Sequence, residues 1–234
     1  MKNLYIIYGC NKYWSRLEAS KNTWMRNIGP DEDYVILGEI SIPELKMVGF
    51  ASDNGQYLNL GIRTLMFLDQ YSDFLKKWDW ITFVDDDAYL FTRRLRKKFK
   101  EEDDELHGVV LGKIIGSEQH IEMNRVKTRF SLIHGGATIS LNKVATNRML
   151  DYLEANKDWL FDRSRVSHSF ASFGDVCVSY LCRKTRSRIV NCPFKLSYTH
   201  HKFNGLKYSD YRKIISSHRV GDEDKKKLYE FDMY

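Results

Sequence analysis

Three consecutive aspartates, Asp85, Asp86 and Asp87, directly follow the short apolar run 80–84. Such a run is typical of a buried central strand, which delivers polar groups at the carboxyl edge of a mostly parallel sheet. Adjacent carboxylates repel one another, so the cluster needs a cation or hydrogen bonds as compensation. Mg²⁺ and Mn²⁺ prefer oxygen ligands and often bridge carboxylates to phosphates. We therefore predict a site for a divalent cation and a phosphate-bearing ligand, with a solvated acidic turn as the simpler alternative.

The rest of the chain alternates between patterns typical of strands and patterns typical of helices. This alternation predicts an α/β fold in which a mostly parallel sheet is sandwiched by helices. The 234 residues, 43% of them hydrophobic, suffice for one core, and we expect a single domain over 1–205 with a helical, charged C-terminal appendage over 206–234. We expect strands at 4–10, 34–37, 80–84, 108–113, 136–141 and 188–191, and helices at 15–27, 56–77, 143–156 and 175–183.

The charge pattern and the cysteines limit the kinds of binding partner and the cellular compartment that we expect. The 37 basic residues are interleaved with 31 acidic ones, so the net charge of +6 permits polyanionic partners without requiring them. The densest basic run, Arg93 to Lys100, predicts an amphipathic helix whose basic face is solvated or, as the next interpretation, touches an anionic membrane. No nucleic-acid motif accompanies it, so no nucleic-acid partner is expected. The four cysteines are scattered along the chain, which indicates reduced thiols. No apolar run approaches the ~20 residues of a membrane span. We therefore expect a cytoplasmic protein, soluble or peripheral to a membrane.

Three further segments carry residue types that chemistry could use, and each also has a simpler interpretation. Gly135 and Gly136 either let the backbone approach a ligand closely or form a plain tight turn. Asp175 opens an apolar helix, where it is either a general base or a carboxylate favoured by the helix N-terminus. His200 and His201 follow an apolar strand and are either metal ligands or ordinary surface histidines.

These segments match, in order, the motifs of one enzyme superfamily. Ser15-Arg16-Leu17 with Thr23-Trp24 resembles its early "SRL…TW" helix, and 80–90 resembles its metal-binding strand end. Gly135-Gly136-Ala137 resembles its "GGAG" segment, and Asp175-Val176 with Tyr180 resembles its "DDVTIGY" or "EDVYVG" element. From about Leu4 to His201 the chain is thus similar to the Fringe-like superfamily, with its β-1,3-galactosyltransferases and β-1,3-N-acetylglucosaminyltransferases. The chain departs from the pattern at Thr138, where the family has glycine, and at Gly174, where it has an acid.

The resemblance implies a fold and a role for each matching residue. The fold is the GT-A type, a Rossmann-like sheet between helices, and its members are inverting glycosyltransferases. Asp87 is expected to bind Mn²⁺ or Mg²⁺, with His201 or its neighbour His200 as the distal metal ligand. Asp85 and Asp86 are expected to contact the donor's ribose or a metal-bound water, and Asp175 is expected to be the catalytic base. The residues expected to lie near the nucleotide are Arg16, Gly135 and Gly136.

The function that the resemblance implies is metal-dependent transfer of a sugar from a nucleotide-sugar, UDP-linked by family analogy, to a glycan, glycolipid or glycoprotein hydroxyl. The product is expected to be β-linked, and β-1,3-linked by the same analogy. The chain shows no Golgi anchor, stem or luminal cysteine pattern, so we expect a microbial or viral relative rather than a Golgi enzyme. The residues alone also allow a nucleotidyltransferase or other nucleotide-binding enzyme that uses the same aspartates, or a non-enzymatic glycan-binding module.

Overall fold

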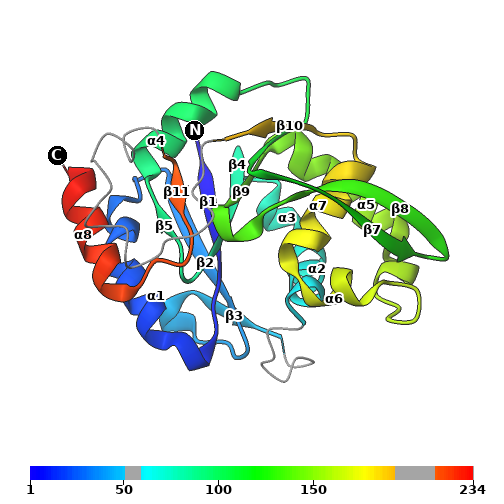
Figure 1. Ribbon diagram of the computed structural model, residues 1–234, viewed down its shortest axis with the longest axis horizontal. Coiled ribbons are helices and arrows are strands. Elements are labelled where there is room, and N and C mark those ends of the chain that lie inside the picture. The colour runs from blue at the N-terminus through cyan, green and yellow to red at the C-terminus, as the bar shows by residue number, and fades with distance from the viewer. Residues whose placement is uncertain (51–58, 193–213, 234) are drawn as a thin grey trace.

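In the computed structural model, which describes residues 1–50, 59–192 and 214–233, a seven-stranded sheet runs between helices on both faces (Figure 1). Only β9 runs antiparallel to its neighbours, while the other pairs in this sheet are parallel. The predicted α/β fold with a mostly parallel sheet is therefore confirmed. Across the sheet the strands are β10 (Arg188–Asn191), β6 (Val109–Gly112), β9 (Ile139–Asn142), β4 (Trp80–Asp85), β1 (Asn3–Tyr8), β2 (Glu32–Gly38) and β3 (Met47–Gly49).

The central strand β1 shows why both faces of the sheet are covered. Successive side chains of a strand point to opposite faces. Leu4 and Ile6 belong to one hydrophobic core with helices α2 (Leu60–Gln70), α5 (Lys143–Leu160) and α7 (Gly174–Lys184). Tyr5 and Ile7 belong to a second core with α1 (Trp14–Lys21) and α4 (Thr92–Glu102). A strand buried on both sides has no polar face, so its sequence is a continuous apolar run rather than an alternation of apolar and polar residues.

Of the predicted helices, one is shorter than its sequence pattern suggested and another is divided in two. The helix expected at 15–27 ends at Lys21, and a 3₁₀ turn, Trp24–Asn27, follows it. The hydroxyl of Thr23 donates to the carbonyl of Ala19 at 2.6 Å, which caps the end of α1 and lets Trp24 enter the core. The helix expected at 56–77 appears as α2, which begins at Leu60, and α3 (Ser72–Leu75); residues 51–58 lie outside the described part of the chain.

A hairpin that the sequence patterns did not predict joins β6 to β9. Its strands are β7 (Ile114–Met123) and β8 (Val126–Ile133), paired antiparallel with a register shift near Ile114. Asn124 and Arg125, at the turn, have positive φ angles of 48° and 62°, as type I′ hairpin turns require. Short helix α6 (His168–Ser172) was likewise not predicted.

The C-terminal segment packs beside the end of β4. Strand β11 (Ser216–Ser217) pairs with β5 (Tyr89–Leu90), which follows the three aspartates, and α8 (Asp222–Met233) lies against α1 (Figure 1). The expected domain boundary at 205 falls outside the described residues. None of the helices in the described part of the chain is long and apolar enough to cross a membrane, and the four cysteines are free thiols.

Candidate active site

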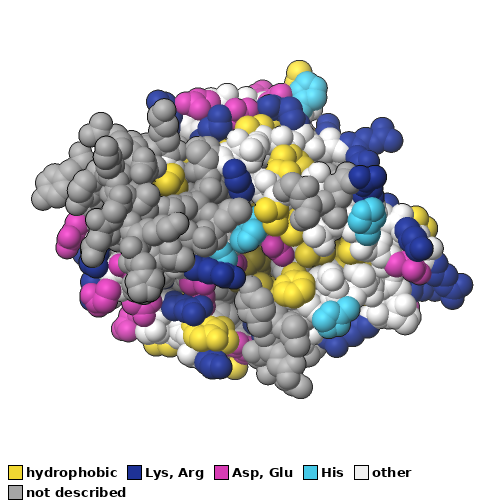
Figure 2. Space-filling view, in the orientation of Figure 1, with side chains coloured by type: hydrophobic (Ala, Val, Ile, Leu, Met, Phe, Trp, Pro, Cys, Tyr) yellow, Lys and Arg dark blue, Asp and Glu magenta, His cyan; other side chains and the backbone are white. Residues whose placement is uncertain are grey.

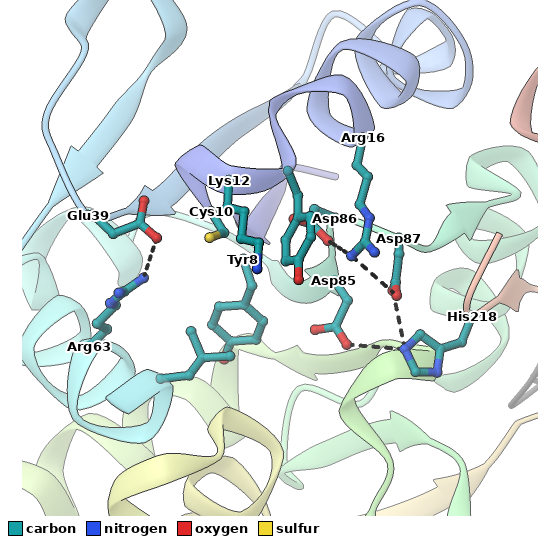
Figure 3. A pocket seen from close by; sticks show the side chains of 13 residues that line it. Tyr8, Cys10, Lys12, Arg16, Glu39, Arg63, Asp85, Asp86, Asp87 and His218 are labelled. Carbon is teal, nitrogen blue, oxygen red and sulfur yellow. Dashed lines mark hydrogen bonds and ion pairs between the residues drawn. The ribbon is translucent and has the colours of Figure 1, made fainter. Parts of the chain in front are cut away.

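A cavity of about 240 Å³ opens at the carboxyl ends of β1 and β4. Side chains from α1, α2 and the segment after β11 close around it (Figure 3). On the face drawn in Figure 2, acidic atoms are visible at the bottom of a hollow that has histidine and basic side chains around it. The cavity is lined by Tyr8, Gly9, Cys10, Lys12, Tyr13, Arg16, Glu39, Leu60, Arg63, Asp85, Asp86, Asp87 and His218.

Asp85, Asp87 and His218 converge at one side of this cavity (Figure 3). Asp85 is the last residue of β4 and is paired with Tyr8, the last residue of β1, so the sheet itself places its carboxylate at the edge. The imidazole Nε2 of His218 lies 3.2 Å from Asp87 Oδ1 and 3.6 Å from Asp85 Oδ2. One ligand atom from each of the three residues lies within 4.8 Å of the other two, a spacing that fits a single metal ion. We call Asp85, Asp87 and His218 the metal group.

The two carboxylates of this group differ in charge state. Burial, together with the neighbouring charge of Asp87, raises the pKa of Asp85 to about 7, although the charge of His218 opposes the shift. Burial also acts to raise the pKa of Asp87, but the hydrogen bond and charge of His218, with Arg16 and Lys225, bring it below its ordinary value. The protein's own groups therefore do not fully compensate a charge on Asp85, which keeps its proton up to about neutral pH, as expected where a cation would bind.

Asp86 turns away from the metal group and toward Arg16. The guanidinium NH1 of Arg16 lies 3.4 Å from Asp86 Oδ1 and 3.7 Å from Asp87 Oδ2. Burial raises the pKa of Asp86 to about 6 although Arg16 opposes the shift. The guanidinium also stacks on Tyr13, 4.0 Å from the ring centroid. Its side chain is 35% exposed, so Arg16 presents a positive charge to the cavity beside the acidic group.

Gly135 and Gly136 lie at points of very close approach in the 3₁₀ turn Gly135–Ala137. A Cβ atom on Gly135 would lie 2.6 Å from the Cβ of Asp175, and one on Gly136 would lie 2.3 Å from the ring of His218. Real Cβ atoms do not approach other atoms so closely, so any side chain here would displace its neighbour. Because they lack side chains, the paired glycines leave room for Asp175 and His218 to pack directly against the same turn.

Asp175 lies in the first turn of α7, at the same edge of the sheet. Its Oδ2 accepts a hydrogen bond from the amide of Gly135 at 3.2 Å, and its Oδ1 accepts one from the amide of Val176 at 2.9 Å. Its charge contributes to the raised pKa of Asp85 and of Tyr8, so it faces both across the site. A side chain at Gly174 would meet the Tyr8 hydroxyl at 2.9 Å, which explains why an acid does not fit there.

His218 is the residue of this group that sequence reasoning missed. The histidines that were expected as metal ligands, His200 and His201, lie outside the described residues. The structure instead brings His218 to the aspartates from the end of β11. The available signal was slight, a single histidine after the short run Ile214 to Ser217.

Comparison with known proteins identifies the family. The model of one family, described as Fringe-like, matches residues 3–218, and the match ends on the histidine that completes the metal group. The chain belongs to the Fringe-like family. No curated protein sequence matches the chain.

The solved structures that share the fold of this Fringe-like protein include two glycosyltransferases. A glycosyltransferase involved in the glycosylation of the major capsid of PBCV-1 superposes with a TM-score of 0.51 at 10% identity, over 98% of this chain and 100% of that one. The apo structure of the bifunctional glycosyltransferase WbbM gives 0.51 at 13% identity, over 94% of this chain and 46% of that one. The fold is that of GT-A glycosyltransferases, and the family assignment makes the chain a glycosyltransferase rather than a nucleotidyltransferase or a non-enzymatic module.

Proposed function

We propose that this glycosyltransferase transfers a sugar from a UDP-sugar to a hydroxyl of a glycan acceptor, with inversion and formation of a β-linkage, β-1,3 by family analogy. The observation that supports this most directly is the convergence of Asp85, Asp87 and His218 beside a cavity whose other rim carries Arg16. A nucleotide-sugar has a diphosphate between its nucleoside and its sugar. A cation site next to a guanidinium suits that diphosphate.

The chemistry of these side chains fits Mn²⁺ or Mg²⁺. Two carboxylates and one imidazole form a mixed oxygen and nitrogen set that suits Mn²⁺ in particular, and Asp87, held in its charged form, is the principal oxygen ligand. His218 takes the place of the distal nitrogen ligand. A bound cation supplies neutralisation of the charge that develops on the leaving diphosphate.

The protein's own groups supply binding, orientation and a proton acceptor. Arg16 binds the diphosphate from the α1 side. Its guanidinium lies within 4 Å of Asp86 and Asp87, so a diphosphate held at the cation site would lie beside it. Asp175 accepts the proton of the attacking hydroxyl, and its two main-chain hydrogen bonds hold the carboxylate toward the site. Fixing donor and acceptor on opposite sides of the anomeric carbon contributes much of the remaining rate.

The cavity extends from the metal group to a second polar group, which we assign to the nucleoside. Arg63 of α2 and Glu39 lie 3.9 Å apart at their closest charged atoms, and both side chains are almost completely buried. Tyr13 lies at the rim, beside Arg16. Buried polar groups that line a pocket give orientation and specificity. The sugar then points away from Glu39, toward Gly136 and Asp175.

The experiment that tests this function is a screen of nucleotide-sugars for Mn²⁺-dependent release of the nucleoside diphosphate, alone and with glycan acceptors. We expect release of UDP from at least one UDP-sugar and its loss in Asp87→Ala. Asp33→Asn, which alters an exposed ion pair with Lys46, serves as the matched control and should retain activity. No release of UDP from any UDP-sugar by the folded, Mn²⁺-loaded protein would remove the basis of the proposal.

Contact with an anionic membrane remains a proposal for the basic run on α4. Arg94, Arg96 and Lys98 donate to acceptors within the protein, so their charge is used internally. Arg93, Lys97 and Lys100 are exposed on the same helix and form the surface that such a membrane would meet. Binding to vesicles that contain anionic lipid, compared with neutral vesicles, tests it.

A further inference from the structure

Lys225, near the start of α8, is completely buried. A lysine ammonium is costly to bury unless its hydrogen-bond donors are satisfied. Its Nζ donates to Ser20 Oγ at 2.8 Å, to the carbonyl of Arg16 at 3.0 Å and to the carbonyl of Asp86 at 2.5 Å. These three bonds use all three ammonium hydrogens, so the charge is satisfied without water.

The three acceptors belong to the two segments that carry the donor site. Asp86 stands between the metal-group residues Asp85 and Asp87, and Arg16 faces them from α1 (Figure 3). The Ser20 hydroxyl donates in turn to the carbonyl of Arg16 at 3.0 Å. Lys225 therefore ties α8 to α1 and to the end of β4 at a single point.

This contact has a geometric and an electrostatic consequence. A bond to the Asp86 carbonyl fixes the peptide plane between Asp86 and Asp87, and so the direction in which Asp87 leaves the main chain. The ammonium of Lys225 also places a positive charge beside Asp86 and Asp87. Burial lowers the pKa of Lys225 itself to about 8. An apolar side chain would fill the same space without that cost, so packing alone does not account for a lysine here.

We propose that Lys225 is a positioning residue of the donor site. From the C-terminal helix it fixes the Asp86 main chain and the first turns of α1, so that Asp87 and Arg16 point at the metal and the diphosphate. The proposal rests on the proposed function, since it takes a metal and a diphosphate to bind between these residues. It also makes α8, which lies outside the region matched by the family, a working part of the enzyme.

The test compares Lys225→Met with wild type and with Lys226→Met. Lys226 is exposed and pairs with Glu223 on the same helix, so it is a matched control for loss of a lysine from α8. We expect Lys225→Met to weaken binding of Mn²⁺ alone, and of UDP in the presence of Mn²⁺, by about 10- to 100-fold, the usual cost of losing a partner that orients metal ligands. Lys226→Met should bind both as wild type does.

A purely structural role would lower the thermal unfolding midpoint of Lys225→Met and leave the affinities of the folded protein unchanged, which would overturn the proposal. If Lys225→Met does not fold, Ser20→Ala decides, because it removes one acceptor and keeps the lysine. We expect Ser20→Ala to weaken Mn²⁺ and UDP binding severalfold, and wild-type affinities would overturn the proposal. If wild type itself fails to bind UDP with Mn²⁺, the proposed function fails. If wild type binds and folded Lys225→Met binds equally well, only the assignment of Lys225 fails.

Discussion

The two ends of the active site hold their carboxylates in different ways. At one end Asp175 is held by the main chain, through amides of its own helix and of the adjoining glycine turn. At the other end three aspartates crowd together, and the cations that face them, Arg16 and Lys225, come from α1 and α8. The first arrangement uses one amide of the same helix and one amide 40 residues away, and the second depends on side chains from segments more than 60 residues away along the chain.

This difference suggests how the work is divided between them. Main-chain amides hold a carboxylate in place without a ligand, which suits a group that must meet an acceptor hydroxyl in a fixed geometry. The aspartate cluster keeps a carboxyl with a pKa of about 7, so its own cations do not fully compensate its charge, and a bound metal ion would complete that compensation. On the proposed function, the Asp175 end handles the proton and the aspartate end handles the metal and the diphosphate.

The largest expected effect separates turnover from binding. Asp175→Asn keeps the size of the side chain but removes the proton acceptor, so we expect kcat for sugar transfer to fall by about 10²- to 10⁴-fold. Binding of Mn²⁺ and UDP should stay within about threefold of wild type, because Asp175 is outside the metal group. Steady-state kinetics and calorimetry measure the two quantities.

The reverse variant is His218→Gln, which removes the imidazole from the metal group. It should weaken Mn²⁺ by about 100-fold or more, and transfer at saturating Mn²⁺ should recover in part. Equal losses of metal affinity in both variants would show that the two ends are not separable.

Two adjacent glycines allow a finer test of the same division. Neither has a positive φ, so alanine is opposed only by lack of space. Gly135→Ala pushes against Asp175, and we expect mainly a fall in kcat, whereas Gly136→Ala pushes against His218 and should mainly weaken Mn²⁺ binding, each by about 10- to 100-fold. The same pattern of losses in both variants would contradict the division, and thermal unfolding midpoints check that both proteins fold.

The sequence predicted the aspartate end better than its partners. The buried, largely apolar run 80–84 followed by Asp85 to Asp87 is a local signal. Neighbouring residues alone indicate both that the strand is buried on its two faces and where its carboxyl end lies. His218 and Lys225 carry no such signal. Their role depends on β11 pairing with β5 and on α8 packing against α1, and contacts between distant segments are not encoded in periodicity.

The unpredicted hairpin has a comparable explanation. Strand β8 has alternating exposed and buried positions near its end but a largely exposed beginning, so its apolar pattern is weak. The useful signal was Asn124, a residue that accepts positive φ in tight hairpin turns. The predicted end of helix α1 was wrong for another reason. The Thr23 hydroxyl donates a hydrogen bond to the carbonyl of Ala19 in the preceding turn, and the helix ends at Lys21 although the apolar pattern continues.

The pH dependence of metal binding should distinguish the two ends as well. Because the pKa of Asp85 is raised from 3.8 to about 7, the metal-free native protein binds more protons than the unfolded chain between these values. Its free energy of unfolding therefore decreases as pH rises through that window. A cation must displace this proton, so Mn²⁺ affinity should rise by up to about tenfold per pH unit below 7 and level off above it.

Manganese titrations between about pH 5.5 and 8 test this, with Asp85→Asn as the comparison. The variant should bind Mn²⁺ more weakly but with a flatter pH profile, because the titrating carboxyl is gone. A wild-type affinity that does not change with pH would mean that Asp85 is already ionised in the metal-free protein. Asp175→Asn removes a charge that raises the pKa of Asp85, so its profile should keep the same shape and shift toward lower pH.

The smallest expected effect concerns Thr138, which joins the two ends. Its φ of 99° is a region that β-branched residues rarely adopt, and such strain costs about 1–3 kcal/mol. Its hydroxyl donates to Ser216 Oγ at 2.9 Å, two residues before His218, so the strained turn is bonded to the strand that directly precedes His218. Thr138→Gly relieves the strain but loses a buried hydrogen bond, about 0.5–1.5 kcal/mol, and adds the chain entropy of glycine, about 0.5–1 kcal/mol.

These contributions largely cancel, so the free energy of unfolding of Thr138→Gly should stay within about 1 kcal/mol of wild type. Mn²⁺ affinity should nevertheless fall severalfold, since His218 loses an anchor, while Thr138→Ser keeps the hydroxyl and should retain most of the affinity. Denaturant unfolding and Mn²⁺ titration of the three proteins separate stability from positioning. If Thr138→Gly binds Mn²⁺ as tightly as wild type, the close approach of Gly136 alone suffices to place His218, and the threonine is a tolerated departure from the family's glycine.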